Sequence, residues 1–132
     1  MIPKAKAAAK LKIQVLAGGI SHEREVSLKS GRRVADALTD AGASVVIREP
    51  DAALLANIRK DKPDVIWPVL HGASGEDGAL RDILALTGVP FVGATAPAAR
   101  LAWDKSIAKV LVAQAGVQTP ASITLPKDTF RE

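Results

Sequence analysis

The chain of 132 residues has no cysteine and no tyrosine, and aromatic residues make up only 3% of it. Without cysteine, disulfides, thiolate metal sites and cysteine nucleophiles are excluded. The scarcity of aromatic rings argues against a nucleic-acid module that works by base stacking. Two histidines, His22 and His71, are too few for a histidine-rich zinc site. We therefore expect no metal site in this chain and a core built from aliphatic side chains and alanine.

Long hydrophobic runs are also missing, since no apolar stretch approaches the roughly 18 residues that a membrane-spanning helix requires. Residues 1–11 are basic but lack the apolar centre of a signal peptide, so we expect a flexible extension there. The net charge is +4, and the lysines at positions 4, 6, 10 and 12 account for it. The remainder is close to neutral, which indicates neither a nucleic-acid partner nor a membrane partner. A cytoplasmic protein is expected.

Apolar runs alternate with amphipathic runs along the rest of the chain. β-strand patterns occupy residues 12–17, 44–48, 65–70 and 91–92, and residues 119–124 form one further extended segment. Helical patterns follow between them, from Val26 to a glycine stop at Gly42, after Asp51, over residues 80–87, after residues 93–97 and over 105–115. This alternation predicts a single three-layer α/β domain over residues 12–125, with a mostly parallel sheet of about four strands. Residues 126–132 would begin a linker.

Two polar loops follow the first and third predicted strands, over residues 18–25 and 71–80. Carboxyl ends of parallel strands lie at one edge of a sheet, where open α/β folds usually bind ligands. If these strands are neighbours, the two loops converge. Gly18-Gly19 alone is weak evidence for a nucleotide site, because neither the G-x-G-x-x-G spacing nor a Walker sequence is present.

Within the first loop, two acids flank Arg24. Capping of the following helix explains one of Glu23 and Glu25, while an ion pair with Arg24 would leave one carboxylate free for a substrate ammonium. In the second loop, His71 can orient a substrate or accept a proton. The alternative is a buried histidine that hydrogen-bonds to the loop backbone.

Two further groups of charged residues lie at predicted helix starts. Glu76 and Asp77 fit a capping pair, with Glu76 also anchoring the loop. Lys105 follows a predicted N-cap, Asp104, and a cation at a helix start opposes the helix dipole. This position favours a phosphate or a partner for Lys105, although a solvated lysine explains it equally simply.

Four stretches, taken together, resemble the N-terminal domain of the D-alanine–D-alanine ligase family. They appear in the family's order and cover nearly all of residues 12–125. The stretches are Val15–Gly19 with Ser21 and Glu23–Leu28; His71–Gly72 with Gly75–Gly78; Gly88–Gly93; and Asp104–Lys105 with Ala115–Val117 and Pro120.

This resemblance implies a pre-ATP-grasp (Rossmann-like) fold that precedes an ATP-grasp region. The family joins two D-alanines with ATP and Mg²⁺ to make a peptidoglycan precursor. By position, Glu23 resembles the carboxylate that anchors the amino group of the first D-alanine, with Ser27 as its support. His71, next to Gly72, resembles the histidine near the carboxylate of that substrate. Lys105 resembles a lysine that reaches the ATP phosphates. The resemblance also implies a homodimer for the complete enzyme.

Two departures from the family pattern stand out. Arg81-Asp82 replaces a glutamine and a small residue, which affects helix packing or loop orientation. The resemblance also stops near Leu125, before the regions that supply the nucleotide clamp and the magnesium ligands. We therefore expect this chain alone to be catalytically incomplete. Two other readings stay open, namely a non-catalytic binding or dimerisation module and an ATP-grasp relative acting on a different amino acid.

Overall fold

A three-stranded parallel sheet forms the centre of the computed structural model, which describes residues 11–126. The strands are β1 (Lys12–Leu16), β2 (Ser44–Arg48) and β3 (Val65–Pro68), in the order β2-β1-β3. The predicted parallel α/β class is confirmed. The strand count was too high, because Phe91 forms only an isolated parallel bridge with Ile66. The flexible extension and the linker expected at residues 1–10 and 127–132 lie outside the described residues.

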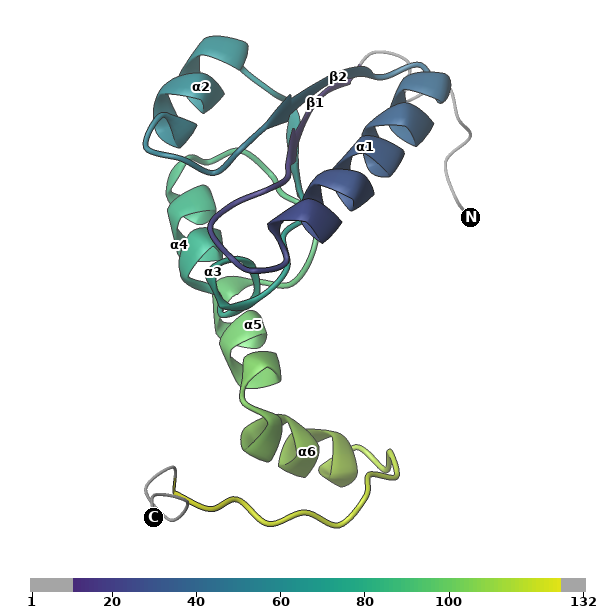
Figure 1. The fold of residues 1–132 in the computed structure, drawn as a ribbon, viewed down its shortest axis with the longest axis vertical. Coiled ribbons are helices and arrows are strands. Elements are labelled where there is room, and N and C mark those ends of the chain that lie inside the picture. Colours follow the sequence, from purple (N-terminus) through teal and green to yellow (C-terminus); the bar gives the residue numbers. More distant parts are fainter. Residues whose placement is uncertain (1–10, 127–132) are drawn as a thin grey trace.

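Six helices alternate with these strands or follow them in the described part of the chain (Figure 1). They are α1 (Arg24–Asp40), α2 (Leu54–Asp61), α3 (Ala73–Glu76), α4 (Ala79–Leu86), α5 (Ala96–Trp103) and α6 (Lys105–Gln114). The short α3 was not predicted. It lies inside the polar loop after β3, where glycines at both ends limit it to a single turn.

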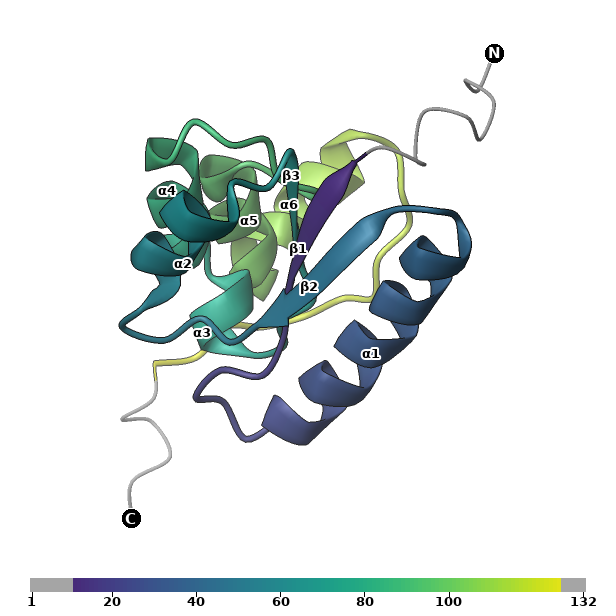
Figure 2. The ribbon, with the colours of Figure 1, turned by 90° about the horizontal axis from the view of Figure 1, so that it is seen from above.

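The helices make a three-layer arrangement, with α1 on one face of the sheet and α2 and α4 on the other (Figure 2). The α1 face buries Ile13 and Val15 against Ala35 and Ala43. The opposite face buries a larger aliphatic cluster made of Leu16, Leu54, Ile58, Ile66, Leu80 and Leu84. Both clusters consist of aliphatic side chains and alanine, as the composition required.

Helix α1 contacts the sheet through small residues. Its buried positions are Ser27, Gly31 and Ala35, and the partly buried side chains of Val34 and Leu38 pack against the same cluster. A Cβ on Gly31 would lie 2.4 Å from the Cβ of Ala17, so the helix approaches the end of β1 too closely for any side chain at this position. The small residues of α1 therefore lie closest to the sheet, and Val34 and Leu38 pack beside them.

The last two helices extend away from the sheet (Figure 1). Helix α5 packs on α3 and α4, and α6 packs on α5. No residue of α6 is buried, and its apolar side chains at Ile107, Val110 and Leu111 are about half exposed. The extended segment expected over residues 119–124 is irregular and pairs with no strand. Among the described residues, no helix has the length and apolarity needed to cross a membrane.

One polar side chain lies within the larger core. Gln14, on the central strand β1, is fully buried, and neither its Oε1 nor its Nε2 has a hydrogen-bond partner among the described residues. A buried polar group without a partner costs about 1–3 kcal/mol of stability. Gln14 is therefore a weak point of an otherwise apolar layer.

We predict that Gln14→Met raises the free energy of unfolding by about 1–3 kcal/mol, because methionine fills a similar volume without polar atoms. Urea denaturation of the full chain measures this change. Gln114→Met, at an exposed position of α6, is the matched control and should leave the free energy unchanged. A loss of stability in Gln14→Met would contradict the prediction.

Candidate functional site

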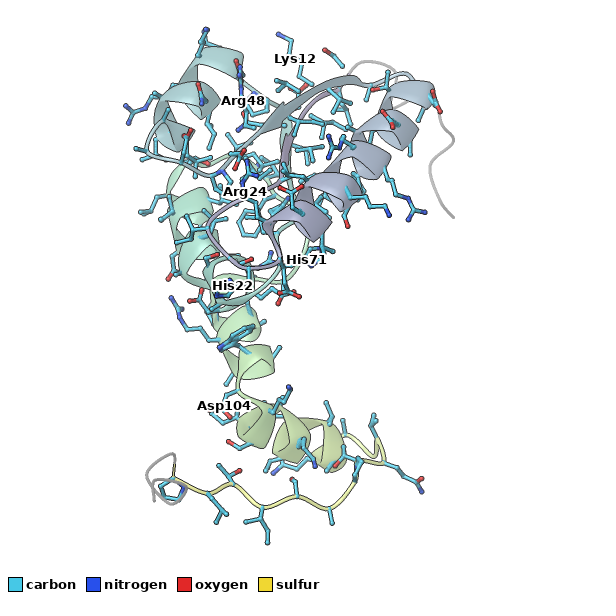
Figure 3. The ribbon with its side chains drawn as sticks, in the orientation of Figure 1. Lys12, His22, Arg24, Arg48, His71 and Asp104 are labelled. Atoms are coloured by element: carbon cyan, nitrogen blue, oxygen red, sulfur yellow. The ribbon has the colours of Figure 1, made fainter. Side chains whose placement is uncertain are left out.

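The two polar loops meet because β1 and β3 are parallel neighbours. Ser21, in the first loop, joins them. Its hydroxyl donates to the carbonyl of His71 at 2.8 Å and accepts the N–H of Glu23 at 3.1 Å. In Figure 3, the labelled side chains of His22 and His71 lie at this end of the α/β layers. The convergence predicted from strand order is thus present.

Ser27, on α1, connects this helix to the segments that follow β1 and β3. Its side chain is fully buried, and its hydroxyl accepts the N–H of Gly18 at 2.8 Å while donating to the carbonyl of Val69 at 2.5 Å. One hydroxyl therefore satisfies backbone groups that follow β1 and β3. This contact makes Ser27 a support for the site, with no atom free to reach a ligand.

Gly72 brings the second loop next to the carboxylate of Glu23. Its φ of +79° lies in the region that favours glycine. A Cβ at this position would lie 3.1 Å from Oε2 of Glu23 and 3.0 Å from the Cβ of Ser21. A side chain here would thus be strained and would crowd Glu23. Glycine leaves the space beside that carboxylate open.

His71 presents an imidazole that is about one third exposed. Its Nδ1 lies 3.9 Å from Oε1 of Glu76, too far for a hydrogen bond. Its Nε2 is buried and has no partner among the described residues. Glu76 accepts the N–H of Gly72 at 3.2 Å, and Asp77 accepts the N–H of Ala79 at 2.9 Å. Glu76 therefore anchors the loop, as predicted, and Asp77 binds the first N–H of α4. The predicted capping pair is not formed, because the N-cap of α4 is Gly78, which makes no side-chain cap hydrogen bond.

Arg24 pairs with an acid that the sequence pattern missed. Its guanidinium contacts Glu49 at 2.5 and 3.2 Å and Glu25 at 3.0 Å. Glu49 follows β2 and also accepts the N–H of Gly19 at 3.4 Å. The hydrogen bond from Arg24 holds the pKa of the Glu49 carboxyl below its ordinary value. In residues 11–126, Glu23 forms no ion pair, so its carboxylate stays available beside Gly72.

The sequence contained one signal for Glu49. Its strand, β2, was predicted with its correct bounds, so the acid that follows it had to lie at the same sheet edge as the two loops. The sequence did not indicate that Arg24 pairs with Glu49, because a contact between residues 25 positions apart depends on the order of the strands. Strand order is a property of the tertiary fold.

Lys105 lies apart from the two loops. It is the first residue of α6, where Asp104 acts as the predicted N-cap by accepting the N–H groups of Ser106 and Ile107 at 2.9 and 3.2 Å. Figure 3 shows Asp104 near the junction of α5 and α6, well separated from His71 along the long axis. The structure brings Glu23, Ser27, His71 and Gly72 together and leaves Lys105 outside that group.

A metal centre is not formed by these groups. Within residues 11–126, no three acidic or histidine side chains gather closely enough to hold a metal ion. The two polar loops, residues 18–25 and 71–80, are called the loop pair below. For chemistry, the loop pair offers one free carboxylate, one imidazole and exposed loop backbone.

Comparisons with known proteins agree with this placement. Residues 48–94 match the family model described as D-ala D-ala ligase N-terminus. The chain is 41% identical over 110 residues to the D-alanine–D-alanine ligase of Moorella thermoacetica, which covers 83% of this chain and 36% of that protein. The corresponding protein of Pseudomonas putida is 41% identical over 118 residues, covering 89% and 37%. This chain is related to the N-terminal region of the D-alanine–D-alanine ligases.

Solved structures of the D-alanine–D-alanine ligases carry the same fold. The enzyme of Bacillus anthracis complexed with ATP matches with a TM-score of 0.75 at 28% identity, over 89% of this chain and 40% of that chain. A D-Ala:D-Ser ligase from Enterococcus faecalis matches with a TM-score of 0.70 at 28% identity, over 91% and 46%. The chain spans somewhat more than one third of the length of the curated ligases it matches.

Arg81 and Asp82, for which an effect on helix packing or loop orientation was expected, both have contacts here. Arg81 donates to the carbonyl of Ala94 at 3.2 Å, and Asp82 forms an ion pair with Arg100 of α5. These contacts tie α4 to the loop before α5 and to α5 itself. These two residues therefore affect the packing of the helices rather than the loop pair.

We predict that Ser27→Ala lowers the free energy of unfolding by about 1–3 kcal/mol, because it leaves the N–H of Gly18 and the carbonyl of Val69 without their partner. Urea denaturation measures the change. Ser30→Ala, one turn along α1, is the control, since its hydroxyl forms no hydrogen bond within residues 11–126. Equal stabilities of the two variants would contradict the bridging role.

The Arg24–Glu49 pair predicts a pH response of the first loop. Because the folded-state pKa of Glu49 is lowered, the stabilisation is fully present above the ordinary value of 4.5 and is lost as the pH falls through the lowered pKa. In an NMR pH titration, we expect the amide signal of Gly19 to move with a midpoint below 4.5. Arg24→Gln should raise this midpoint, and Glu25→Gln should change it much less. A midpoint that is unchanged in Arg24→Gln would refute the pairing of Arg24 with Glu49.

Proposed function

We propose that this chain is the N-terminal substrate-binding part of a D-alanine–D-alanine ligase, which joins two D-alanines with ATP for peptidoglycan precursor synthesis. The observation that carries the proposal is the meeting of Glu23 with His71 and Gly72 at one sheet edge. The matched relatives are more than twice as long as this chain. We therefore propose that the 132 residues bind the first D-alanine and do not complete the reaction.

The available groups fit the two ends of an amino acid. The Glu23 carboxylate has no ion pair within residues 11–126, so it can accept the substrate ammonium. A charge-assisted hydrogen bond of this kind contributes about 1.5–3 kcal/mol. The imidazole of His71, which is about one third exposed, can donate a hydrogen bond to the substrate carboxylate. Gly72 leaves space between these groups, and Ser27 keeps the loops in register beneath them.

Lys105 is proposed to contact an ATP phosphate in the complete enzyme. A single exposed lysine at the start of α6 supplies one positive charge, which by itself is no nucleotide site. When bound, ATP would activate a carboxylate for attack by an amine. The proposal places no magnesium ligand on this chain. A cytoplasmic location and homodimeric assembly of the complete enzyme belong to the same proposal.

Two other functions remain candidates on specific observations. The likeness to a D-Ala:D-Ser ligase supports a relative that uses a different second amino acid, because this region shares its fold with both kinds of ligase. The exposed apolar side chains of α6 support a non-catalytic binding or dimerisation module. The loop pair favours the ligase part over both, since it offers a carboxylate and an imidazole to one amino acid.

Titration of the isotopically labelled chain with D-alanine tests the proposal by NMR. We expect shifts in both loops, centred on Glu23 and Gly72. Glu23→Gln and His71→Gln should each weaken binding by about tenfold or more, as loss of a charge-assisted hydrogen bond implies. Glu25→Gln is the matched control, because that acid already pairs with Arg24.

The same samples separate the alternatives. Dimerisation in light scattering without any D-alanine response would favour the dimerisation module. Incubation with D-alanine, ATP and Mg²⁺ should give no dipeptide. Formation of D-alanyl-D-alanine by the purified 132 residues would contradict the proposed incompleteness.

A further inference from the structure

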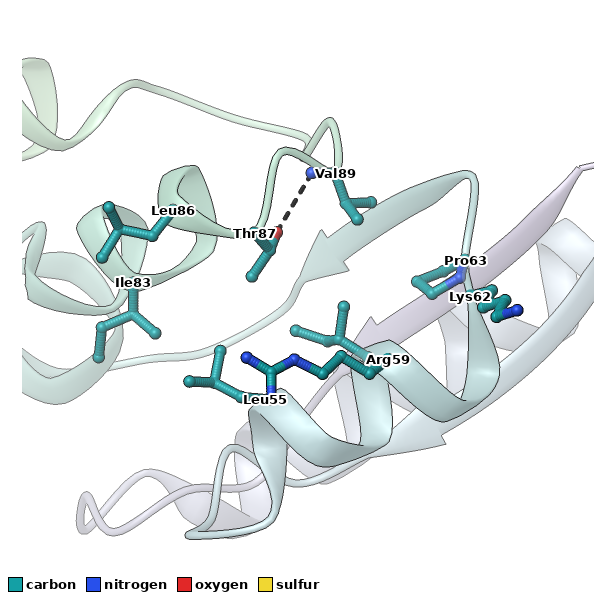
Figure 4. A pocket seen from close by; sticks show the side chains of 9 residues that line it. Leu55, Arg59, Lys62, Pro63, Ile83, Leu86, Thr87 and Val89 are labelled. Atoms are coloured by element: carbon teal, nitrogen blue, oxygen red, sulfur yellow. Dashed lines mark hydrogen bonds between the residues drawn. The ribbon is translucent and has the colours of Figure 1, made fainter.

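A cavity of about 510 Å³ lies between α2 and α4, on the sheet face opposite α1 (Figure 4). It faces the end of the sheet where β3 begins, whereas the loop pair lies where β3 ends. Its volume falls in the range of roughly 300–1,000 Å³ that is typical of small-molecule sites. Leu55, Ile58, Arg59, Lys62, Ile83 and Leu86 are among its lining residues.

The walls of the cavity are apolar and only partly covered. Leu55 of α2 and Ile83 of α4 are 44% and 42% exposed, and Leu86 at the end of α4 is 88% exposed. Ile58 forms the buried base and belongs to the larger core. An apolar group placed between the helices would remove these side chains from water, which is favourable in proportion to the area buried.

The polar groups of the cavity carry one sign of charge. No aspartate or glutamate lines it, and Arg59 and Lys62 form no ion pair within residues 11–126. The hydroxyl of Thr87 is already occupied, because it donates to the carbonyl of Leu84 at 2.6 Å and accepts the N–H of Val89 at 3.2 Å. The side chains thus offer a ligand two cations and no free acceptor. Figure 4 shows both on the α2 side, with the Arg59 guanidinium beside Leu55 and Lys62 next to Pro63.

The backbone of Lys62 adds an independent observation. Its φ of +46° makes it the only non-glycine residue with a positive φ in the described part of the chain. Glycine is the usual residue at this position after a helix, since a side chain there is strained. The chain thus carries a cation beside the cavity at a position where glycine would be less strained.

We propose that this cavity is a binding site for an amphipathic carboxylate, in which an aliphatic group lies between α2 and α4, the carboxylate pairs with Arg59, and Lys62 adds positive charge at the rim. Charge complementarity decides the class of ligand. Two unpaired cations favour an anion, and the apolar walls favour an attached hydrocarbon over a small inorganic ion. The site is separate from the loop pair and does not depend on the proposed ligase function.

Calorimetric and NMR titrations of the full chain with octanoate test this proposal. We expect octanoate to shift the signals of Leu55, Ile83 and Leu86 and to bind at least about tenfold more tightly than octanol or octylamine, because only the anion can pair with Arg59 and is attracted by Lys62. Acetate should bind weakly, since it lacks the apolar chain. Equal binding of all three octyl compounds, or shifts confined to α6, would overturn the proposal.

Substitutions at the two cations sharpen the test. Arg59→Gln should weaken octanoate binding by about tenfold, whereas Lys60→Gln, on the same helix but outside the cavity, should change it by less than about twofold. Lys62→Gly should also weaken binding while raising the thermal midpoint of unfolding, since glycine relieves the backbone strain. Unchanged octanoate binding in both Arg59→Gln and Lys62→Gly would refute the site.

A second copy of the chain is the competing occupant. Light scattering of the chain and of Leu86→Glu distinguishes it. A dimer that Leu86→Glu converts to a monomer would show that another copy covers the cavity and would overturn the proposal. A monomer that binds octanoate through Arg59 supports it.

Discussion

The Ser27 hydroxyl is the contact on which the described arrangement depends. It lies at the point where β1 and β3 end and α1 passes beneath them, and it satisfies one backbone group from each strand end. The loops that follow two neighbouring parallel strands always begin at the same edge of the sheet. Strand order alone does not keep these loops close together. The buried hydroxyl keeps Gly18 and Val69 at hydrogen-bonding distance from one atom, and the Ser21–His71 contact closes the loops above it.

Charge is divided among the acids at this edge. Glu49 neutralises Arg24 from the end of β2, and Glu76 accepts a backbone N–H within the second loop. Glu23 is left without an ion pair within residues 11–126, beside a glycine that has no side chain to block it. The same surface therefore contains acids with structural roles and one acid that is free for a ligand. The two ends of the sheet also differ, since the cavity between α2 and α4 presents cations and apolar walls.

Sequence periodicity predicted most of the elements, including β2 with its correct bounds and α6 with Asp104 as its cap. It failed at Phe91, where one bridge replaces a strand, and it did not indicate that Ser27, Gly31 and Ala35 are the buried positions of α1. The second error has a physical cause. A pattern reports which residues are apolar, whereas burial also depends on how closely two backbones approach, and Gly31 allows an approach that apolarity cannot indicate.

By itself, the sequence determined the α/β class, the two polar loops and the family to which their residues point, because these depend on local periodicity and on residue type. Only the tertiary structure decided that Arg24 pairs with Glu49, that Ser27 bonds to backbone rather than facing a ligand, and that Lys105 lies apart from Glu23 and His71. Each of these contacts joins segments that are distant along the chain, and the position of Lys105 depends in the same way on how such segments pack. Such relations follow from strand order and helix packing, which no single stretch of sequence encodes.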